Sequence, residues 1–300
     1  MPRIGISLEA ASWRGAFIAG VLQSFLRRGV RPDLLSGSSS GACNGAAFIA
    51  ARHDLLEENW VDLASMPLVD FRRASRKANG GSIFNMSRIF SRALDRGLDP
   101  AAAEAIAGSP TEFLVVCTRL VGDDWRTGRW TEGALLRYPL SRRLARLRGR
   151  DLPLPPLAGE VFSNRELRMR ENLREVLYAS GRIPVLYPVH ARINGTHYVD
   201  GGFVDKNPVL SLLERGCDRV LALVSNPQGI VRESFFNGGE SRAVREARRS
   251  GRLLVVRPPR ELGVSKYSWS VSKVARAVRW GNEAGETFLK EHGEDFFAPE

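Results

Sequence analysis

The stretch "LLSGSSSGACNGAAF", which begins at residue 34, holds three consecutive serines between two glycines. The pattern G-x-S-x-G fits it in one register only, with Gly37 and Gly41 on either side of Ser39. Glycines at these two positions permit a tight strand-to-helix turn that strains the backbone of the central residue and exposes its hydroxyl. We therefore predict that Ser39 is a nucleophile, with Ser38 and Ser40 as its flanks.

A nucleophilic serine needs a group that accepts its proton, and the histidines are weak candidates for that group. They are His53, His190, His197 and His292. His292 comes late in the chain, as in a Ser–Asp–His order, but we interpret its charged run "KEHGEDFF" as the surface of a last helix. His190 precedes "RINGTHY", a predicted turn, and His197 lies within it; structural roles are more common there than catalytic ones.

The segment "YVDGGFVDKNP" offers a carboxylate instead. Asp200 follows an aromatic and a β-branched residue, and Gly201 and Gly202 after it allow a sharp turn. A carboxylate in this place can take the serine proton directly if partial burial among its apolar neighbours raises its pKa. From the residues alone, an ordinary Asp-Gly turn at a loop tip is the alternative.

The elements that must position these groups alternate between strands and helices. Expected strands are Arg3–Glu9, Pro32–Gly37, Phe113–Leu120, Arg219–Asn226 and Leu253–Pro259, and expected helices are Gly15–Gly29 and Ala42–Ala51. Short apolar, β-branched runs between helices are typical of a mostly parallel sheet that helices cover on both faces. We predict an α/β fold, a three-layer α/β/α sandwich with a central, mostly parallel sheet.

Two arginine-rich stretches, residues 65–110 and 125–169, interrupt this alternation. We expect a single domain over residues 1–300 in which these stretches are inserts. Long inserts often lie at the surface near a functional site, so they are candidates for a cap or for a surface that meets phospholipid headgroups. Ordinary amphipathic covering helices with solvated arginines are the alternative.

The composition favours a folded chain with anionic partners. Of its 300 residues, 43% are hydrophobic and 26% are charged, which excludes intrinsic disorder as the main state. The formal net charge is +11 and comes mainly from arginine, whose planar guanidinium suits phosphate on lipid surfaces or nucleic acid. A solvated basic face is the alternative. We find no zinc-finger spacing, helix-turn-helix or stacking motif, so we expect no specific nucleic-acid partner.

Targeting and redox signals are few. The start "MPRIGISLEA" lacks the pattern of a signal peptide, and no window reaches the roughly 18 apolar residues of a membrane span. Cys43, Cys117 and Cys217 lie far apart without a C-x-x-C pair, which indicates reduced thiols rather than a disulfide framework or a zinc site. We expect a cytoplasmic protein, at most peripheral to a membrane, with no metal and no cofactor.

Three stretches in fixed order resemble the patatin-like phospholipase family. They are "LEAASWRGAF" near the N-terminus, "GSSSGACNGAA" after the second predicted strand, and "YVDGGFVDKNPV" late in the chain. The continuation "LLERGCDRVLALVSNPQG" is also similar to bacterial members of the family. Each motif is of limited specificity alone, but the three together are specific, and the resemblance covers nearly the whole chain.

The resemblance implies a serine hydrolase that works without histidine. Ser39 would attack an acyl ester and form an acyl-enzyme, and Asp200 would act as general base and then as general acid. The family's fold is a mostly parallel sheet between helices, its usual substrates are phospholipids, galactolipids or other lipid acyl esters, and most members need no metal. Headgroup, chain length, the position cleaved, the oligomeric state and whether water or another acceptor takes the acyl group stay open.

The chain departs from the family at the expected oxyanion loop. Members resemble G-G-G-x-R-G after the first strand, but here Ala10, Ala11 and Ser12 replace the three glycines, while Arg14 and Gly15 are retained. Each residue still has a backbone N–H, yet a positive φ costs a residue with a Cβ roughly 1–2 kcal/mol. The alternative interpretation is therefore a weakly active or inactive member that binds lipid.

Overall fold

One sheet organises the chain. The structure, a computed structural model, describes residues 2–72, 77, 82–120, 125–150, 157–236, 239–265 and 270–297. Its eight described strands are β1 (Ile4–Leu8), β2 (Leu34–Ser38), β3 (Glu112–Leu120), β4 (Leu157–Ser163), β5 (Ala191–Ile193), β6 (Thr196–Asp200), β7 (Arg219–Leu223) and β8 (Leu253–Val256). Their order in the sheet is β5-β6-β3-β2-β1-β7-β8, with β4 also paired to β3.

Five neighbouring strands of the sheet form a parallel core, and the other three strands pair in antiparallel orientation. β3, β2, β1, β7 and β8 pair in parallel, because helical crossovers return the chain to the same end of the sheet each time. β4 and β6 run antiparallel to β3, and β5 runs antiparallel to β6. The sheet is thus mostly parallel, as predicted.

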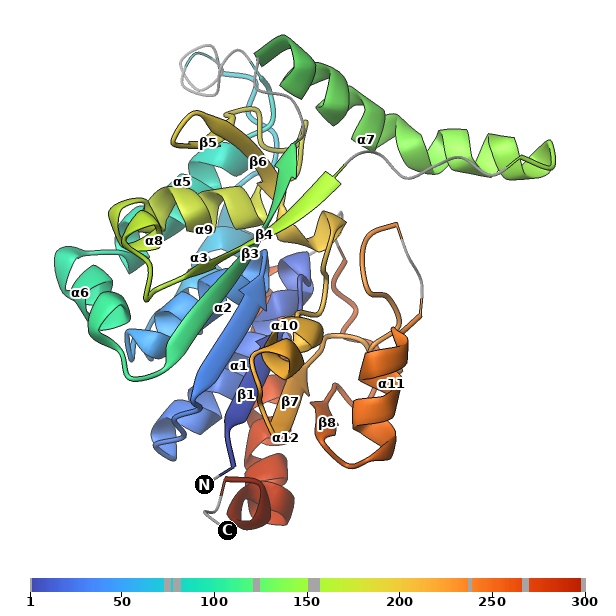
Figure 1. The fold of residues 1–300 in the computed structure, drawn as a ribbon. Coiled ribbons are helices and arrows are strands. Elements are labelled where there is room, and N and C mark those ends of the chain that lie inside the picture. Colours follow the sequence, from blue (N-terminus) through green and yellow to red (C-terminus); the bar gives the residue numbers. More distant parts are fainter. Residues whose placement is uncertain are drawn as a thin grey trace.

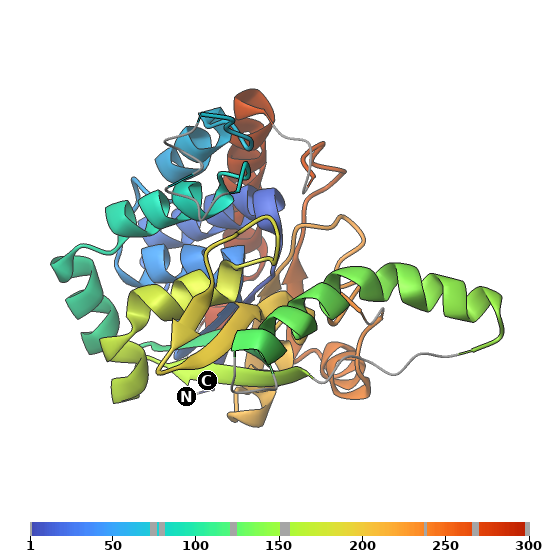
Figure 2. The same ribbon diagram turned by 90° about the horizontal axis from the view of Figure 1, so that it is seen from above.

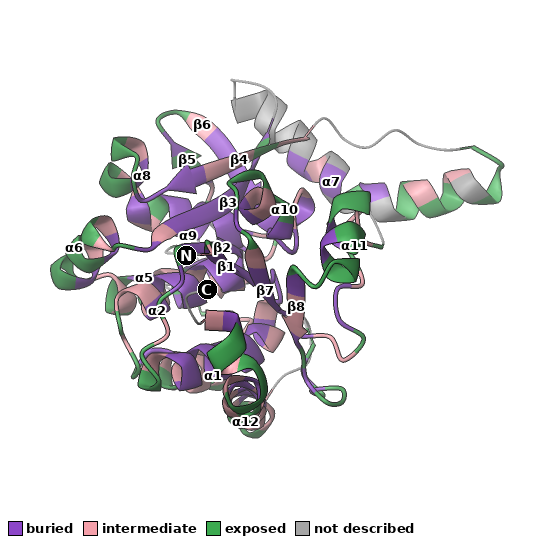
Figure 3. Cartoon of the chain, turned by 60° about the horizontal axis from the view of Figure 1, so that its bottom comes forward, coloured by how far each residue is buried: buried purple, intermediate pink, exposed green. Residues whose placement is uncertain are grey.

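Helices cover both faces of the sheet, which confirms the predicted three-layer α/β/α sandwich (Figure 1). On one face lie α1 (Gly15–Arg27), α2 (Ser40–Ile49), α9 (Leu173–Gly181) and α12 (Val271–Phe297). On the other face lie α10 (Val209–Glu214) and α11 (Arg242–Arg249). Successive side chains of β2 point to opposite faces of the sheet. Leu35 packs in the core under α1 and α2, and Leu34 packs in the core under α10. The strands are buried, whereas the outer faces of α6 and α11 are exposed (Figure 3).

The sequence prediction missed three strands, and each omission has a physical reason. β4 contains Gly159 and the charged Glu160, so it lacks the apolar run of a central strand. β5 and β6 form a hairpin, which the sequence analysis had treated only as a turn. Its loop residues, Asn194 and Gly195, have φ of 49° and 82°, the two positive values that a two-residue hairpin turn needs.

The first arginine-rich stretch, residues 65–110, contributes α5 (Met86–Gly97) and α6 (Pro100–Gly108), and α3 (Glu58–Ser65) precedes it. Within this stretch, residues 73–76 and 78–81 lie outside the described part of the chain. Asp99 caps α6 by accepting a hydrogen bond from the Ala102 N–H at 2.8 Å. α5 packs beside α9 and α3, and α6 packs against α2, so this stretch covers the face of the sheet on which α2 and α9 lie.

The second stretch, residues 125–169, contributes α7 (Trp125–Leu147), β4 and α8 (Leu167–Glu171), and its residues 151–156 lie outside the described ranges. α7 begins beside the ends of β3 and β6 and extends away from the rest of the molecule (Figures 1 and 2). Within the described ranges, none of the helices combines the length and hydropathy needed to cross a bilayer.

Candidate active site

Ser39 lies at a sharp turn between β2 and α2. Its φ of 56° and ψ of −125° put it in a backbone region that residues with a Cβ rarely adopt. A Cβ at Gly37 would come within 2.7 Å of the Ala42 nitrogen, and one at Gly41 within 2.4 Å of the Leu8 carbonyl oxygen. Glycine is therefore required on both sides, and the predicted strand–turn–helix geometry is present.

β3 brings Ser39 and Asp200 together, although 161 positions separate them in the chain. β4 runs along one edge of β3 from Leu114 to Leu120, so β2 and β6 must share the other edge. On that edge, Ser38 pairs with Val116 and Asp200 pairs with Cys117. Two consecutive residues of β3 thus set the end of β2 against the end of β6.

The two side chains contact each other directly. The Ser39 hydroxyl donates a hydrogen bond to Asp200 Oδ2 at 2.6 Å, and the Gly202 N–H donates to Asp200 Oδ1 at 2.8 Å. Asp200 is 0% exposed, so its burial is complete rather than partial. A Cβ at Gly201 would lie 2.2 Å from the Val116 carbonyl oxygen, which explains the glycine directly after Asp200.

Ser180, in α9, is a further residue at the turn that the sequence analysis did not identify. Its hydroxyl accepts a hydrogen bond from the Ser39 N–H at 2.9 Å and donates to the Val116 carbonyl at 2.7 Å. It thereby satisfies the buried amide of the strained residue. No motif surrounds Ser180 in the sequence, so only the packing of α9 on the sheet reveals it.

Most N–H groups of the predicted oxyanion loop already have partners. The Ala10 N–H donates to the Lys206 carbonyl at 2.8 Å, and the Ala11 N–H donates to Ser40 Oγ at 3.1 Å. The N–H groups of Arg14 and Gly15 donate to carbonyls within the short helix η1 (Ser12–Arg14) and its start. These four amides are therefore engaged within the protein.

Ser12 differs from the other replacements. Of the three residues that stand in glycine positions, it alone has a positive φ, 52°. Among the described residues, neither its N–H nor the N–H of Ser40 has a hydrogen-bond partner. Ser12 and Ser40 both line the cavity that contains Ser39, and the Ser40 amide is at the N-terminus of α2. The structure thus offers two donors for a developing negative charge.

A buried ion pair ties the oxyanion loop to the segment after Asp200. Lys206 Nζ contacts Glu9 Oε1, and both side chains are buried. The other oxygen of Glu9 accepts hydrogen bonds from the Ser225 N–H and hydroxyl at 2.5 and 2.6 Å. Because Ala10 binds the Lys206 carbonyl, the pair fixes both the start of the loop and its partner segment. The sequence analysis did not identify this pair.

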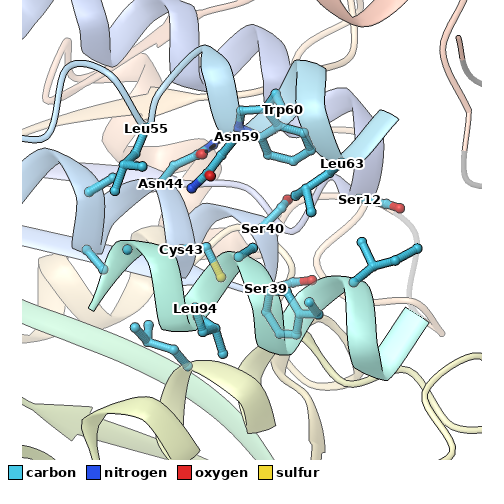
Figure 4. A pocket seen from close by; sticks show the side chains of 18 of the residues that line it. Ser12, Ser39, Ser40, Cys43, Asn44, Leu55, Asn59, Trp60, Leu63 and Leu94 are labelled. Carbon is cyan, nitrogen blue, oxygen red and sulfur yellow. Dashed lines mark hydrogen bonds between the residues drawn. The ribbon is translucent and has the colours of Figure 1, made fainter. Parts of the chain in front are cut away.

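A narrow cavity of about 120 Å³ opens beside Ser39. Its walls come from α2, α3, α5 and α9 and are mainly apolar, with Leu55, Leu63, Ile89, Phe90, Leu94 and Leu177 among them. Figure 4 shows Ser12, Ser39 and Ser40 on one side of this space and Leu55 across it. The cavity therefore suits an apolar chain whose polar end lies at the serines.

Other titratable groups in the cavity are poor nucleophiles. Cys43 follows Ser39 by one helical turn of α2, and burial, together with the Asp200 charge, raises the pKa of its thiol to about 12. Burial and Asp200 also raise the pKa of Tyr187. A thiol needs its deprotonated form to attack, so Cys43 does not compete with Ser39. Cys117 and Cys217 are free and buried, as predicted.

The histidines lie elsewhere. His292 is exposed on α12, as predicted, and His190 contacts Glu132 at 3.1 Å rather than Ser39. Burial lowers the pKa of His197, whose ring lies 5.8 Å from that of His190. No histidine lines the cavity at Ser39 among the residues that the structure describes. Those residues also contain no cluster of side chains suited to a metal ion.

Comparisons with known proteins identify a family and two similar proteins. The family model described as "Patatin-like phospholipase" matches residues 6–213. The chain is 25% identical over 227 residues to "Uncharacterized protein YjjU" of Escherichia coli, covering 75% of this chain and 52% of that protein. It thus spans about half the length of this curated relative. Among solved structures, VipD from Legionella pneumophila matches with a TM-score of 0.42 and 12% identity, over 96% of this chain and 66% of that one.

Proposed function

The chain belongs to the patatin-like phospholipase family, and on that premise we propose that it cleaves lipid acyl esters with a Ser39–Asp200 dyad. The hydrogen bond of 2.6 Å between Ser39 Oγ and Asp200 Oδ2 is the observation that carries this proposal. It joins a hydroxyl on a strained, glycine-bounded turn to a buried carboxylate that can accept its proton. No third residue is needed for the proton transfer.

In the first step, Asp200 takes the Ser39 proton as the hydroxyl oxygen attacks the ester carbonyl carbon. The C=O electron pair moves onto the carbonyl oxygen, which becomes an oxyanion. The free N–H groups of Ser12 and Ser40 can donate to that oxygen, and the N-terminus of α2 favours its negative charge. The Ser12 amide stands at one of the glycine positions of the family pattern, and the Ser40 amide, at the start of α2, lies outside that pattern.

In the second step, the oxyanion collapses and the bond from carbon to the alcohol oxygen breaks. Asp200 returns its proton to the leaving alcohol, and the acyl group stays on Ser39 as an ester. Water then repeats the sequence: Asp200 takes a water proton, the hydroxide oxygen attacks, and the proton finally returns to Ser39 as the carboxylic acid leaves. Atoms and charge balance over the cycle without a metal or cofactor.

The acyl chain would occupy the apolar cavity, and the first insert would form part of its wall. Met86, Ile89, Phe90 and Leu94, all in α5, line the cavity within residues 65–110. We therefore propose that this insert is the cap of a single domain, that the substrate is a phospholipid or another lipid acyl ester, and that the protein meets it at an anionic membrane surface in the cytoplasm.

The test is hydrolysis of p-nitrophenyl esters and of phospholipid vesicles by the wild-type chain, Ser39→Ala and Asp200→Asn. We expect each substitution to reduce turnover by at least about 10³-fold, because both groups act in the same step. Ser38→Ala is the matched control, since its hydroxyl is buried beside the turn and makes no hydrogen bond within the described residues. Wild-type turnover no faster than that of Ser39→Ala would refute the proposal.

A second candidate function is lipid binding without turnover. It is favoured by the engaged amides of Ala10 and Ala11, which leave Ser12 as the loop's own donor. A fluorophosphonate probe distinguishes the two functions, because it labels an activated serine and not a passive one. Labelling of the wild type but not of Ser39→Ala supports the hydrolase, and co-purified lipid without labelling supports the binding protein. Product analysis on a mixed lipid extract then identifies the headgroup and the acyl acceptor.

A further inference from the structure

We propose that residues 137–150, the outer half of α7 and the three residues that follow it, dock on the surface of an anionic lipid bilayer. We call this segment the docking helix. The proposal deepens and rests on the proposed function, because a hydrolase of membrane lipids must be held at the surface that contains them. It depends on features of α7 that the active site does not use.

The inner half of α7 is anchored on the segment that carries Asp200. Glu132 forms an ion pair with the buried Arg182 at 2.6 Å, and the Arg182 carbonyl accepts the Asp200 N–H at 2.8 Å. Burial opposes the charge on Glu132, but hydrogen bonds from His190 and Arg182 lower its pKa to about 2. Leu135 packs with Val199 in one buried cluster. This half of the helix therefore has a fixed place.

The last anchoring contacts lie near the middle of the helix. The Tyr138 ring contacts the Phe236 ring at 5.0 Å, and Arg142 donates to the Phe236 carbonyl at 2.8 Å. Beyond them the helix leaves the body of the protein (Figures 1 and 2). Its outer part is coloured mainly as exposed in Figure 3.

The docking helix carries an apolar stripe in solvent. Leu140, Leu144 and Leu147 are 64%, 47% and 77% exposed. At 3.6 residues per turn, their spacing of four and three residues places them within about 60° of one another on the helix. Elsewhere such stripes face a core, as Val244 and Ala247 of α11 do. Here the stripe faces water, and an apolar stripe of this kind indicates a surface for a partner.

Arginines flank the leucine stripe on both sides. By the same helical spacing, Arg137 and Arg143 lie within about 40° of the nearest leucine, and Arg148 directly follows Leu147, the last residue of the helix. All three are exposed, and none forms an ion pair among the described residues. The sequence has no Asp or Glu between Gly133 and Arg150. An apolar stripe bordered by unpaired cations matches the interface between acyl chains and anionic headgroups.

This charge pattern favours a bilayer over the other anionic partners. Nucleic acid would engage the arginines but would leave the leucines in water. A second copy of the chain would have to place two basic helices together, because the docking helix contains no carboxylate. An anionic bilayer satisfies the leucines and the arginines at the same time.

The test uses the full chain carrying Ser39→Ala, so that lipid is not consumed during the measurement. Flotation is measured with vesicles of phosphatidylglycerol and phosphatidylcholine and with vesicles of phosphatidylcholine alone. We expect binding to the anionic vesicles only, weakened by salt. The triple variant Arg137→Gln, Arg143→Gln and Arg148→Gln should weaken binding by about 100-fold, because each lost arginine removes one attraction to the anionic surface. Leu140→Ser with Leu144→Ser and Leu147→Ser should weaken it by a similar factor.

The matched control is Arg242→Gln with Arg245→Gln and Arg249→Gln in α11. It removes the same charge from exposed arginines on a helix whose apolar side is buried. Binding that falls equally in this control would overturn the proposal in favour of net charge alone. Three other outcomes would also overturn the proposal. The first is equal binding to both vesicle types, and the second is nucleic-acid binding at physiological salt that is lost when the docking-helix arginines are replaced. The third is a dimer that dissociates when the leucines are replaced.

The two proposals fail separately. The docking-helix variants, made in the active chain, should keep wild-type hydrolysis of a soluble p-nitrophenyl ester, because none of their residues lies at Ser39. Ester hydrolysis without vesicle binding would refute the docking helix alone. Vesicle binding without ester hydrolysis or probe labelling would refute the proposed hydrolase alone.

Discussion

Two serines at the candidate site have a positive φ, and the groups that hold each of them in place differ. Ser39 has φ of 56° and Ser12 has φ of 52°. At Ser39, neighbours in the sequence enforce the conformation, because Gly37 and Gly41 let α2 and β1 approach within distances that a Cβ forbids. The loop that carries Ser12 is held by a remote segment instead, because the Ala10 N–H donates to the Lys206 carbonyl and Lys206 pairs with Glu9.

The difference explains why one motif is intact and the other is degraded. A turn held by local sterics needs its glycines, so a sequence that keeps the turn must keep the pattern. A loop held by a buried ion pair and by hydrogen bonds to remote groups can tolerate residues with a Cβ, at the expense of some strain. Loss of the glycines at residues 10–12 therefore does not by itself imply loss of the loop's shape.

The largest expected effect comes from breaking the remote tie. Lys206→Met should reduce the free energy of unfolding by about 3–5 kcal/mol, because it leaves the Glu9 carboxylate buried without its cation. Denaturant unfolding measures this loss. The double variant Glu9→Gln with Lys206→Met should recover part of it, since the uncompensated charge is gone. A single variant as stable as the wild type would show that the pair does not hold the loop.

Overfilling the local turn should have the next largest effect. Gly41→Ala places a Cβ where the Leu8 carbonyl oxygen lies 2.4 Å away, so we expect a loss of about 3 kcal/mol together with loss of ester hydrolysis. Gly108→Ala, near the end of α6, is the control because its added Cβ meets nothing within 4 Å. Equal thermal stability of the two variants would contradict the steric account.

The free energy of unfolding should depend on pH through Asp205, which lies next to Lys206 and away from the Ser39 turn. Burial raises the pKa of Asp205 from 3.8 to about 7, against a hydrogen bond from the Asn207 N–H and with help from Glu233 and Glu214. The folded state then holds this proton more tightly than the unfolded chain, so the free energy of unfolding should fall as pH rises from about 4 to about 7.

Asp205→Asn provides the control for this pH dependence. The amide keeps the shape and the acceptor for the Asn207 N–H at 3.1 Å but cannot titrate. Chemical unfolding at several pH values should therefore show a flatter profile for the variant. An unchanged slope would assign the pH dependence to other groups.

The smallest effect concerns Ser12 itself. Ser12→Gly should stabilise the protein by up to about 1 kcal/mol, since glycine adopts a positive φ without strain, although the freer unfolded chain offsets part of the gain. Hydrolysis should persist, because the backbone N–H remains. Ser12→Ala, which keeps the Cβ and removes the hydroxyl, should leave stability unchanged. A loss of activity in Ser12→Ala alone would show that the hydroxyl is the oxyanion donor.

Much of the architecture could be predicted from the sequence. The alternation of short apolar runs with amphipathic helices predicted the parallel strands β1, β2, β3, β7 and β8 and the helices α1 and α2, because each has the periodicity of its own element. β4 and the β5–β6 hairpin escaped prediction. They are short or contain charged residues, and their stability comes from pairing with β3 and with each other rather than from local preference.

The sequence alone determined which residues have the chemistry: a serine that must sit on a strained turn because glycines flank it, and an aspartate before two glycines. Only the tertiary structure decided that Ser39 meets Asp200, since neighbouring residues of β3 align the ends of β2 and β6. Only tertiary packing placed Ser180 beside Ser39 and brought Glu9 and Lys206 together. It also left the N–H groups of Ser12 and Ser40 without partners among the described residues. The physical reason is that local sterics act between neighbours in the chain, whereas polar partners are selected by which segments the sheet brings together.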